Sequence, residues 1–350
     1  MKPTINRLAL WLAGSAVALA VPGMASAQDL TVVSWGGAYQ KSQEEAFIKP
    51  FESKFGAKIT EESYNGEVSK IRAMVQSGTV SWDVVDVDSA TVRQACDEGI
   101  LEQIDYSKVA PKKDFVEGAL HECGVPNIVY STIFAYDADK IKTDPPTKIA
   151  DLFDTKRWPG KRALWKNPFG NLEAALMADG VPANKVYETL RTPAGVDRAF
   201  KKLDTIKKDV VWWEAGAQPP QLLASGEVVM AQAWNGRIYD ADKNGKNFKI
   251  VWDGQLQDWD LWAIPKGSKH LAEAYKFIAF SSEPKVIALQ TKYISYGPAV
   301  LAAIPNVPPD ILKDLPTAPQ NSKNVLVNDA QFWGDNGEEL RKRFNTWLAQ

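Results

Sequence analysis

The chain has 350 residues, with 43 acidic and 41 basic side chains, a formal net charge of -2, 13 Trp, 2 Cys and 2 His. With 45% hydrophobic and 24% charged residues, the composition is that of a folded globular protein rather than of a disordered or collagen-like chain. The small net charge and the lack of a basic run argue against nucleic acid as a partner. The few Cys and His residues cannot build a zinc or iron–sulfur site, so we expect neither a metal nor a cofactor.

The N-terminus has the pattern of a secretory signal peptide. Lys2 and Arg7 precede an apolar stretch at 8–21, and Ala25-Ser26-Ala27 supplies small residues for cleavage. The alternative is an uncleaved membrane anchor, but the stretch is shorter than the roughly 20 residues that a spanning helix needs, and no Cys follows it for lipidation. We therefore expect residues 1–27 to be removed and the protein to act in the periplasm.

Export changes the interpretation of the two cysteines. An oxidising compartment permits a disulfide, and Cys96 and Cys123 allow one intramolecular pairing. The alternative is two separate buried thiols. We expect the disulfide, because a free thiol is a liability in an exported protein.

Strands and helices alternate along the first part of the mature chain. The hydrophobic pattern predicts strands at 30–34, 58–62 and 82–87, and helices at 40–55, 67–77 and 90–98. This order favours a mostly parallel sheet with right-handed crossovers. Ligands of such sheets bind beyond the carboxyl ends of the strands, which here are the segments 35–37 and 86–89.

A second α/β unit is predicted after Asp137. Its strands are expected at 164–166, 210–213, 228–233 and 250–252, with helices at 171–178, 183–191, 196–208 and 218–224. The segment 261–265 is expected to lead back toward the first unit. Amphipathic helices follow at 272–280 and 337–348.

Motifs of catalysis are missing from the sequence. It contains no G-x-S-x-G, H-E-x-x-H, Walker or G-x-G-x-x-G motif. Asp83, Asp86 and Asp88 alternate along a strand but lack the Gly turn and distal Glu of a calcium loop, so we expect solvated or capping roles for two of them. His121 and His270 are expected to be surface or packing residues. The sequence predicts a binding protein rather than an enzyme.

Aromatic and charged residues gather at the predicted strand ends. Trp35 and Tyr39 follow the first strand, Trp234-Asn235-Gly236-Arg237 follows the strand at 228–233, Trp259-Asp260 precedes 261–265, and Tyr296 follows a helix. Their rings offer flat apolar walls and a cation-attracting face. Core packing is the expectation for most Trp residues. We expect Trp35 and Trp234 to contact ligand, because each lies at a strand-to-turn junction close to a Gly.

Several motifs in order resemble the periplasmic solute-binding proteins of ABC transporters, in the branch that binds polyamines and γ-aminobutyrate. They are L-T-V-V-S-W-G-G-A-Y, F-E-S-K-F-G-A-K-I, W-D-V-V-D-V-D-S and W-N-G-R. The resemblance implies a two-lobed α/β fold that traps its ligand on closure, and an inner-membrane ABC permease as partner. The lobes are expected to comprise 28–137 with 265–305, and 138–264 with 306–350, in a monomer.

The resemblance also implies which residues bind the ligand. It places ring contacts at Trp35 and Trp234, a polar contact at Asp88 or Ser89, a carboxylate at Asp260 and a Tyr contact at Tyr296. Tyr64, Asn171 and Gln218 are left open as further cleft residues.

Arg237 departs from the polyamine pattern, which generally has a small neutral residue after W-N-G. A guanidinium about 4 Å from an ammonium costs on the order of 4 kcal/mol at an effective dielectric near 20, which is roughly three decades of affinity. The same side chain accepts a carboxylate through two parallel hydrogen bonds. Arg237 and Asp260 therefore predict a zwitterion site, with γ-aminobutyrate as the leading ligand.

Three alternatives stay open from the sequence. If Arg237 points away from the cleft, the site would take a diamine such as putrescine or spermidine. An iron carrier of similar architecture would need an adjacent Tyr pair, and an exported hydrolase would need a nucleophile–base pair. Neither pair is evident in the sequence.

Overall fold

The computed structural model describes residues 29–350, so the predicted signal peptide lies outside the described residues. The first strands are β1 (Asp29–Ser34), β2 (Lys58–Ser63) and β3 (Val84–Asp88), and β1 pairs in parallel with both others. The helices α3 (Val68–Ser77) and α4 (Ser89–Asp97) follow β2 and β3. The predicted parallel β-α-β-α-β unit is confirmed.

The helix expected at 40–55 contains a wide turn. It consists of α1 (Gly37–Gln43), a π-helical turn (Glu44–Ile48) and α2 (Lys49–Phe55). Pro50 lies at the start of α2 and has no N–H to donate to the carbonyl of Ala46, which is consistent with a wide turn at this point. Phe47 and Phe51 of this helical segment are buried.

Two long strands run through the middle of the sheet. β4 (Val125–Asp137) and β8 (Phe248–Ala263) pair antiparallel along almost their full length. The sheet order is β2-β1-β3-β8-β4-β7-β5-β6, so these two strands join the two parallel parts. Register shifts near Pro126 and Thr132 interrupt the ladder. β4 was not predicted from the sequence, and β8 includes both the strand predicted at 250–252 and the start of the segment 261–265.

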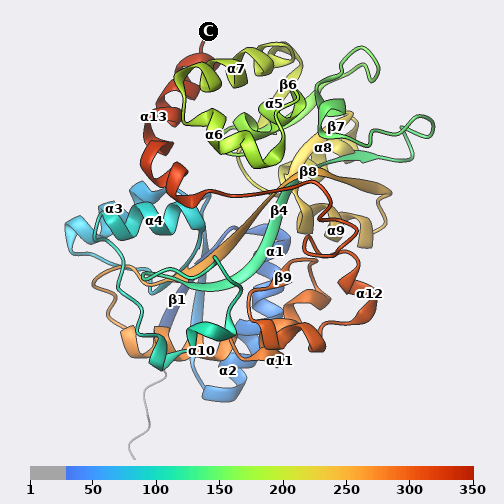
Figure 1. Cartoon of the computed structure of the whole chain (residues 1–350). Coiled ribbons are helices and arrows are strands. Elements are labelled where there is room, and N and C mark those ends of the chain that lie inside the picture. Colours follow the sequence, from blue (N-terminus) through green and yellow to red (C-terminus); the bar gives the residue numbers. More distant parts are fainter. Residues whose placement is uncertain (1–28) are drawn as a thin grey trace, which may run out of the picture.

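The second parallel part of the sheet contains β5 (Arg162–Trp165), β6 (Val210–Trp213) and β7 (Met230–Trp234), with β5 between the other two. Its helices lie at the top of Figure 1 and to the right. They are α5 (Asn171–Ala178), α6 (Val186–Leu190), α7 (Pro193–Asp204), α8 (Gln218–Ser225) and α9 (Asn235–Lys243).

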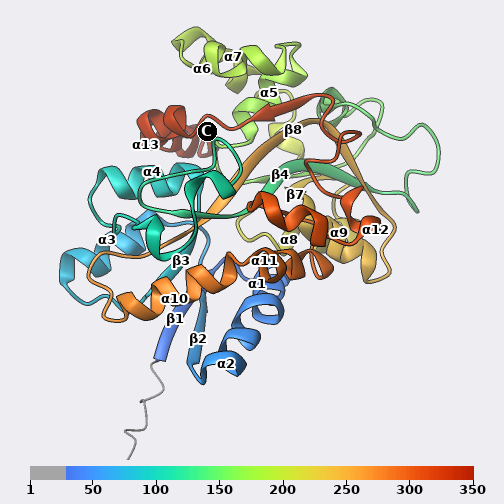
Figure 2. The ribbon, with the colours of Figure 1, turned by 60° about the horizontal axis from the view of Figure 1, so that its bottom comes forward.

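The C-terminal third of the chain returns to both parts of the sheet. Figures 1 and 2 show α10 (Leu271–Ser281), α11 (Pro284–Leu289) and α12 (Pro309–Leu312) near the first part. β9 (Gly297–Pro298) pairs with β4, and β10 (Val325–Val327) pairs with β8. The last helix, α13 (Ala330–Leu348), packs against α4. It begins earlier than predicted, at the N-cap Asp329, whose side chain accepts a hydrogen bond from the Phe332 N–H. Gly334 inside the helix permits close packing, because a Cβ there would lie 2.9 Å from Arg93 Cδ of α4.

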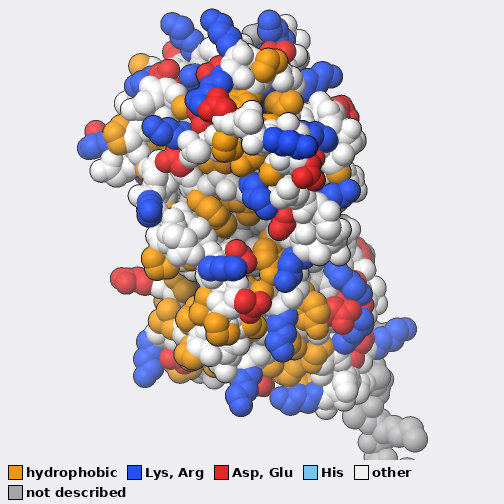
Figure 3. Space-filling model, turned by 90° about the vertical axis from the view of Figure 1, so that its right-hand side faces the viewer, with side chains coloured by type: hydrophobic (Ala, Val, Ile, Leu, Met, Phe, Trp, Pro, Cys, Tyr) orange, Lys and Arg blue, Asp and Glu red, His pale blue; other side chains and the backbone are white. Residues whose placement is uncertain are grey.

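Buried apolar side chains lie in both parts of the molecule. One cluster joins Leu30 and Val32 of β1 with Phe277 of α10, and it also contains Val307 and Ile311. We expected residues 306–350 to fall in the second lobe. Val307 and Ile311 pack in this cluster of the first part, whereas Phe344 and Trp347 pack in a cluster with Phe200 of α7. In Figure 3, Lys and Arg side chains gather on the upper part of the visible face, and hydrophobic side chains show on the lower part. Between residues 29 and 350, no helix has the length and hydrophobicity needed to cross a membrane.

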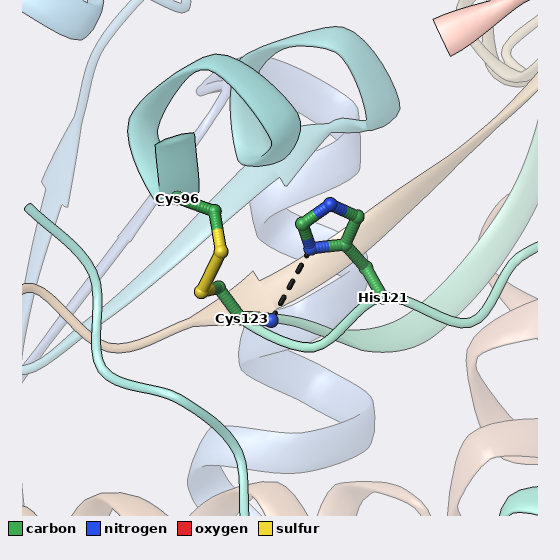
Figure 4. A group of neighbouring side chains, drawn as sticks. All are labelled: Cys96, His121 and Cys123. Atoms are coloured by element: carbon green, nitrogen blue, oxygen red, sulfur yellow. Dashed lines mark hydrogen bonds between the residues drawn. A yellow bond between two sulfur atoms is a disulfide. The ribbon is translucent and has the colours of Figure 1, made fainter. Parts of the chain in front are cut away.

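The predicted disulfide between Cys96 and Cys123 is present and closes a sequence separation of 27. His121 lies beside it, where its Nδ1 accepts a hydrogen bond of 3.2 Å from the Cys123 N–H (Figure 4). The ligand atoms of these three residues lie within 4.8 Å of one another. Because both sulfur atoms are in the disulfide, neither is a thiolate, which is the form of Cys that binds metal.

Candidate ligand-binding site

The carboxyl ends of the parallel strands supply the aromatic walls of one small cavity. Trp35 follows β1 directly, Trp165 ends β5, and Trp234 ends β7. Asp88, the last residue of β3, also lines this cavity. The sheet thus places its candidate site where parallel strands commonly bind ligands.

Six of the eight predicted ligand-binding residues line this cavity. They are Trp35, Tyr39, Asp88, Trp234, Asp260 and Tyr296. Ser89 and Arg237 lie next to the cavity but are not among the side chains that line it. We refer below to this space as the inner cavity.

The inner cavity is narrow and opens near a larger cleft. Its volume is about 10 Å³, whereas the cleft has about 490 Å³. Trp35, Asp88 and Trp165 line both spaces. A volume of about 10 Å³ is close to that of one water-sized sphere, so an amino acid can enter only when the surrounding elements move apart.

The rings around the inner cavity contact one another edge to face. The Trp234 ring centroid lies 5.7 Å from that of Trp35 and 5.5 Å from that of Trp165. Tyr39 and Tyr296 meet at 5.2 Å with an interplanar angle of 82°. Such pairs hold each ring in a fixed orientation, which preserves flat walls for a methylene chain.

Asn235 and Gly236 of the W-N-G-R motif connect neighbouring segments of the chain. The Asn235 Oδ1 accepts a hydrogen bond from Ser131 N, and its Nδ2 donates to the Ser295 carbonyl. Gly236 permits close packing, because a Cβ there would lie 2.6 Å from the ring of Tyr296. The motif thereby joins the end of β7 to β4 and to the segment that carries Tyr296.

Arg237 is buried and joins the two parts of the sheet. Its Nη1 donates to the Gly36 carbonyl at 2.7 Å, and its Nη2 donates to the Trp35 carbonyl at 3.2 Å. Among the described residues its buried Nε has no hydrogen-bond partner. The guanidinium lies 5.7 Å from the ring centre of Tyr39 and 5.8 Å from that of Trp234. It therefore faces the rings that line the inner cavity.

Four carboxyl groups lie on the adjacent strands β3 and β8: Asp86 and Asp88 of β3, and Asp258 and Asp260 of β8. The antiparallel register places Asp88 directly opposite Asp260. Burial raises the pKa of Asp260 well above its ordinary value, and the charges of Asp86, Asp88 and Asp258 raise it further. Burial also raises the pKa of Asp258 to about 7. The site thus contains several carboxyl groups whose mutual repulsion opposes ionisation of all of them at once.

The side chains of Asp88 and Ser89 form hydrogen bonds with neighbouring protein groups. Both Asp88 carboxylate oxygens accept hydrogen bonds from Thr91, so Asp88 caps the N-terminus of α4. The Ser89 hydroxyl donates to Asp258 at 2.6 Å and accepts from Asn328. Ser89 therefore orients Asp258.

Tyr64, Asn171 and Gln218, which the sequence left open as cleft residues, do not line the inner cavity and form hydrogen bonds with backbone groups. The Tyr64 hydroxyl donates to the Asp86 carbonyl, and its ring lies 5.2 Å from that of Trp35. Asn171 donates to the Trp165 carbonyl. Gln218 accepts hydrogen bonds from the N–H groups of Glu214 and Ala215.

Two of the three strand acids differ from the expectation of solvated side chains. Asp86 is fully buried and accepts three side-chain hydrogen bonds. Asp83 is buried at the other end of the strand, where its carboxylate contacts Ser268 and lies 3.0 Å from His270 Nδ1.

Sequence reasoning missed three residues that line the inner cavity: Ile128, Tyr130 and Trp165. Trp165 could have been found, because it lies in the predicted strand at 164–166, one residue before its end, and is an aromatic residue near a strand end like Trp234. Ile128 and Tyr130 lie on β4, whose nearly continuous burial gives no alternating pattern.

The chain is similar to known binding proteins along most of its length. Residues 46–320 match the family model described as bacterial extracellular solute-binding protein. A γ-aminobutyric acid-binding protein of Pseudomonas aeruginosa is 46% identical over 334 residues, which cover 95% of each chain. Relatives at 25% identity include spermidine/putrescine-binding periplasmic proteins.

Solved structures share the whole architecture. A GABA receptor matches with a TM-score of 0.82 and 34% identity, covering 92% of this chain and 98% of the other. MotA of A. tumefaciens B6, solved with glucopine, matches with a TM-score of 0.87 and 32% identity, covering 92% of this chain and 100% of the other. The predicted fold class and the prediction of a binding protein rather than an enzyme are confirmed. The family implies a small-molecule ligand and an ABC permease as partner. This chain belongs to the bacterial extracellular solute-binding protein family.

Proposed function

We propose that this protein is the periplasmic receptor of an ABC importer for a small linear zwitterionic amino acid, with γ-aminobutyrate as the leading ligand. The observation that carries the proposal is that the buried Asp260 lines the ring-walled cavity, while the buried guanidinium of Arg237 lies 5.7 Å and 5.8 Å from two rings of the same cavity, those of Tyr39 and Trp234. The 46% identical relative is named for the same ligand, which supports it further.

The unpaired polar atoms have a polarity that suits a zwitterion. Buried N–H groups of Arg237, Trp35 and Trp234 lack hydrogen-bond partners among the described residues. A carboxylate is the natural acceptor for such donors. The Asp260 carboxylate in the inner cavity is placed to accept an ammonium. The two ligand charges would thus point in opposite directions, with the methylenes between the rings.

Arg237 also argues against a second ammonium. A diamine in this cavity would place one ammonium near a fixed guanidinium, at a cost on the order of 4 kcal/mol. A specific observation still favours a polyamine as the second candidate. Four carboxyl groups gather at the site, and the two hydrogen bonds of Arg237 go to backbone carbonyls.

Transport would proceed by binding and closure. Arg237 comes from α9, whereas the carbonyls that it contacts follow β1 directly, so both parts of the sheet contribute to the site. A ligand that contacts both parts stabilises the closed form, which the permease would recognise. We propose that the protein works as a monomer in the periplasm after removal of residues 1–27.

Isothermal titration calorimetry with γ-aminobutyrate, putrescine and spermidine tests the proposal. We expect γ-aminobutyrate to bind more tightly than putrescine by roughly three decades, the factor that corresponds to the electrostatic cost above. Tight binding of spermidine with no response to γ-aminobutyrate would establish the polyamine alternative instead.

A further inference from the structure

Asp86 is a buried acid that the binding geometry above does not use. It is 0% exposed and does not line the inner cavity. Three donors converge on a single oxygen: Tyr39 Oη at 2.8 Å, Gln43 Nε2 at 2.5 Å and Asn127 Nδ2 at 2.9 Å all reach Oδ2. Its other oxygen, Oδ1, is buried and has no hydrogen-bond partner among the described residues. A carboxylate oxygen left in this state carries a substantial desolvation cost.

The neighbour that can resolve this cost is Asp260. Asp88 pairs with Asp260 across β3 and β8, which makes Asp86 the diagonal neighbour of Asp260 on the same face. A side-chain hydrogen bond between the two carboxyl groups is among the causes of the pKa shift of each. Two acceptors cannot satisfy one another, but a single proton between them gives an O–H···O hydrogen bond. That proton would also remove one of two adjacent negative charges.

Burial disfavours ionisation of both carboxyl groups, so the shared proton is retained near neutral pH. It raises the pKa of Asp86 to about 6 in spite of the three donors. It raises the pKa of Asp260 well above its ordinary value, with the charge of Asp86 as the next cause. Both shifts agree with the geometry, since they favour a pair that holds a proton.

The groups around Asp86 and Asp260 do not balance the two negative charges that the pair would carry if both were ionised. The titratable or charged groups that face it are Tyr39 from α1, Tyr64 after β2, Asp88 from β3, Tyr130 from β4, Asp258 from β8, Arg237 from α9 and Tyr296 before β9. Burial raises the pKa of each of these tyrosines, so they stay neutral. Asp88 and Asp258 oppose ionisation of the pair, and Arg237 favours it.

We propose that Asp86 and Asp260 share one proton in the ligand-free protein, and that the ammonium group of the ligand enters in exchange for this proton. The exchange is balanced, since one positive charge enters the site, one proton leaves to solvent, and no bond to carbon changes. It rests on the proposed function only in requiring a ligand that carries an ammonium group. Asp86 acts here as a positioning residue, because it controls the charge of Asp260 and holds the hydroxyl of Tyr39.

Calorimetry in buffers of different ionisation enthalpy measures the exchange directly. For γ-aminobutyrate at about pH 6 we expect release of approximately one proton per ligand, and affinity that rises by up to tenfold per pH unit. Asp86→Asn should reduce the release to near zero and flatten the pH dependence. Asp83→Asn removes another buried acid near the same strand, away from the cavity, and should leave the release unchanged.

The outcomes separate this proposal from the proposed function. If putrescine binds and γ-aminobutyrate does not, the same titration with putrescine still counts the protons. If proton release persists in Asp86→Asn and disappears in Asp258→Asn, the source is Asp258 and the proposal is wrong. Binding without proton release at any pH between about 5 and 8 also overturns it.

A second measurement needs no ligand. Carbon-13 NMR of the aspartate carboxyl groups in the ligand-free protein should show a protonated carboxyl near neutral pH that is lost in Asp86→Asn. Circular dichroism establishes that the variant folds. If the spectrum of the wild type shows both Asp86 and Asp260 ionised at about pH 6, the shared proton does not exist.

Discussion

Ligand choice depends on Arg237 at the scale of single residues. The guanidinium is fully enclosed, yet its Nε has no partner among the described residues. Asp260 provides the opposite charge in the inner cavity. Arg237 was predicted because it departs from the polyamine pattern after W-N-G. Asp260 was predicted from the resemblance to the family. It could not predict that Arg237 also bonds the carbonyls of Trp35 and Gly36, since those contacts depend on how the two parts of the sheet meet.

Replacing Arg237 should remove binding of the zwitterion. We expect Arg237→Ala to weaken γ-aminobutyrate binding by about two to three decades, because truncating one partner of a buried charge pair costs about 2–5 kcal/mol. Calorimetry on folded protein measures the loss. Arg341→Ala is the matched control, since Arg341 lines the outer cleft rather than the inner cavity. Unchanged affinity in Arg237→Ala would show that this side chain does not bind the carboxylate.

Replacing Asp260 should have opposite effects on binding and on stability. Asp260→Asn removes the acceptor for the ammonium, so affinity should fall by at least two decades. At a pH where the shared proton has been lost, the ligand-free variant should melt at a higher temperature than the wild type, because the substitution removes the repulsion between the Asp260 charge and those of Asp86, Asp88 and Asp258. Calorimetric melting and titration test the pair of effects, and a lower melting temperature would contradict the repulsion argument.

At the scale of elements, the short parallel strands were predictable and the long central strands were not. β1 and β6 are short apolar runs with clear turn signals, which the pattern identifies. β4 is buried along nearly its whole length and contains Pro126, so it shows neither alternation nor an uninterrupted apolar run. β8 contains Gly254 close to a register shift, and the sequence pattern predicted a strand only at 250–252, before this glycine. Both long strands carry residues that line the inner cavity.

The start of α4 depends on Asp88. Its carboxylate accepts from the Thr91 N–H at 2.7 Å and from the Thr91 hydroxyl at 3.0 Å. Asp88→Ala should therefore lower the free energy of unfolding by about 1 kcal/mol, the usual cost of losing an N-cap. Asp88→Asn keeps an acceptor and should stay close to the wild type. Urea unfolding compares the two, and equal stability of Ala and Asn variants would mean that the cap contributes nothing.

At the scale of the whole molecule, buried acids make stability depend on pH. Burial raises the pKa of Glu173 and Asp258 to about 7 and that of Asp86 to about 6. These groups keep their protons in the folded protein at pH values where the unfolded chain has lost them. The folded state therefore binds more protons between about pH 4 and 7.

The free energy of unfolding should consequently fall as pH rises through this window. We expect the ligand-free protein to be more resistant to urea at about pH 5 than at about pH 8. Glu173→Gln should flatten the dependence, because Glu173 is buried between Tyr187 and Trp333 and contributes one of the raised pKa values. Stability that is constant or greater at the higher pH would contradict the assignment of protonated buried carboxyls.

If Arg237 and Asp260 form the site, one ligand must lie between these two opposite charges. A crystal structure of the protein grown with γ-aminobutyrate is the most direct test. We predict that the ligand carboxylate lies within hydrogen-bonding distance of the Arg237 guanidinium, and that its ammonium contacts Asp260. A ligand bound in the reverse direction, or in the outer cleft beside Arg341, would contradict the account.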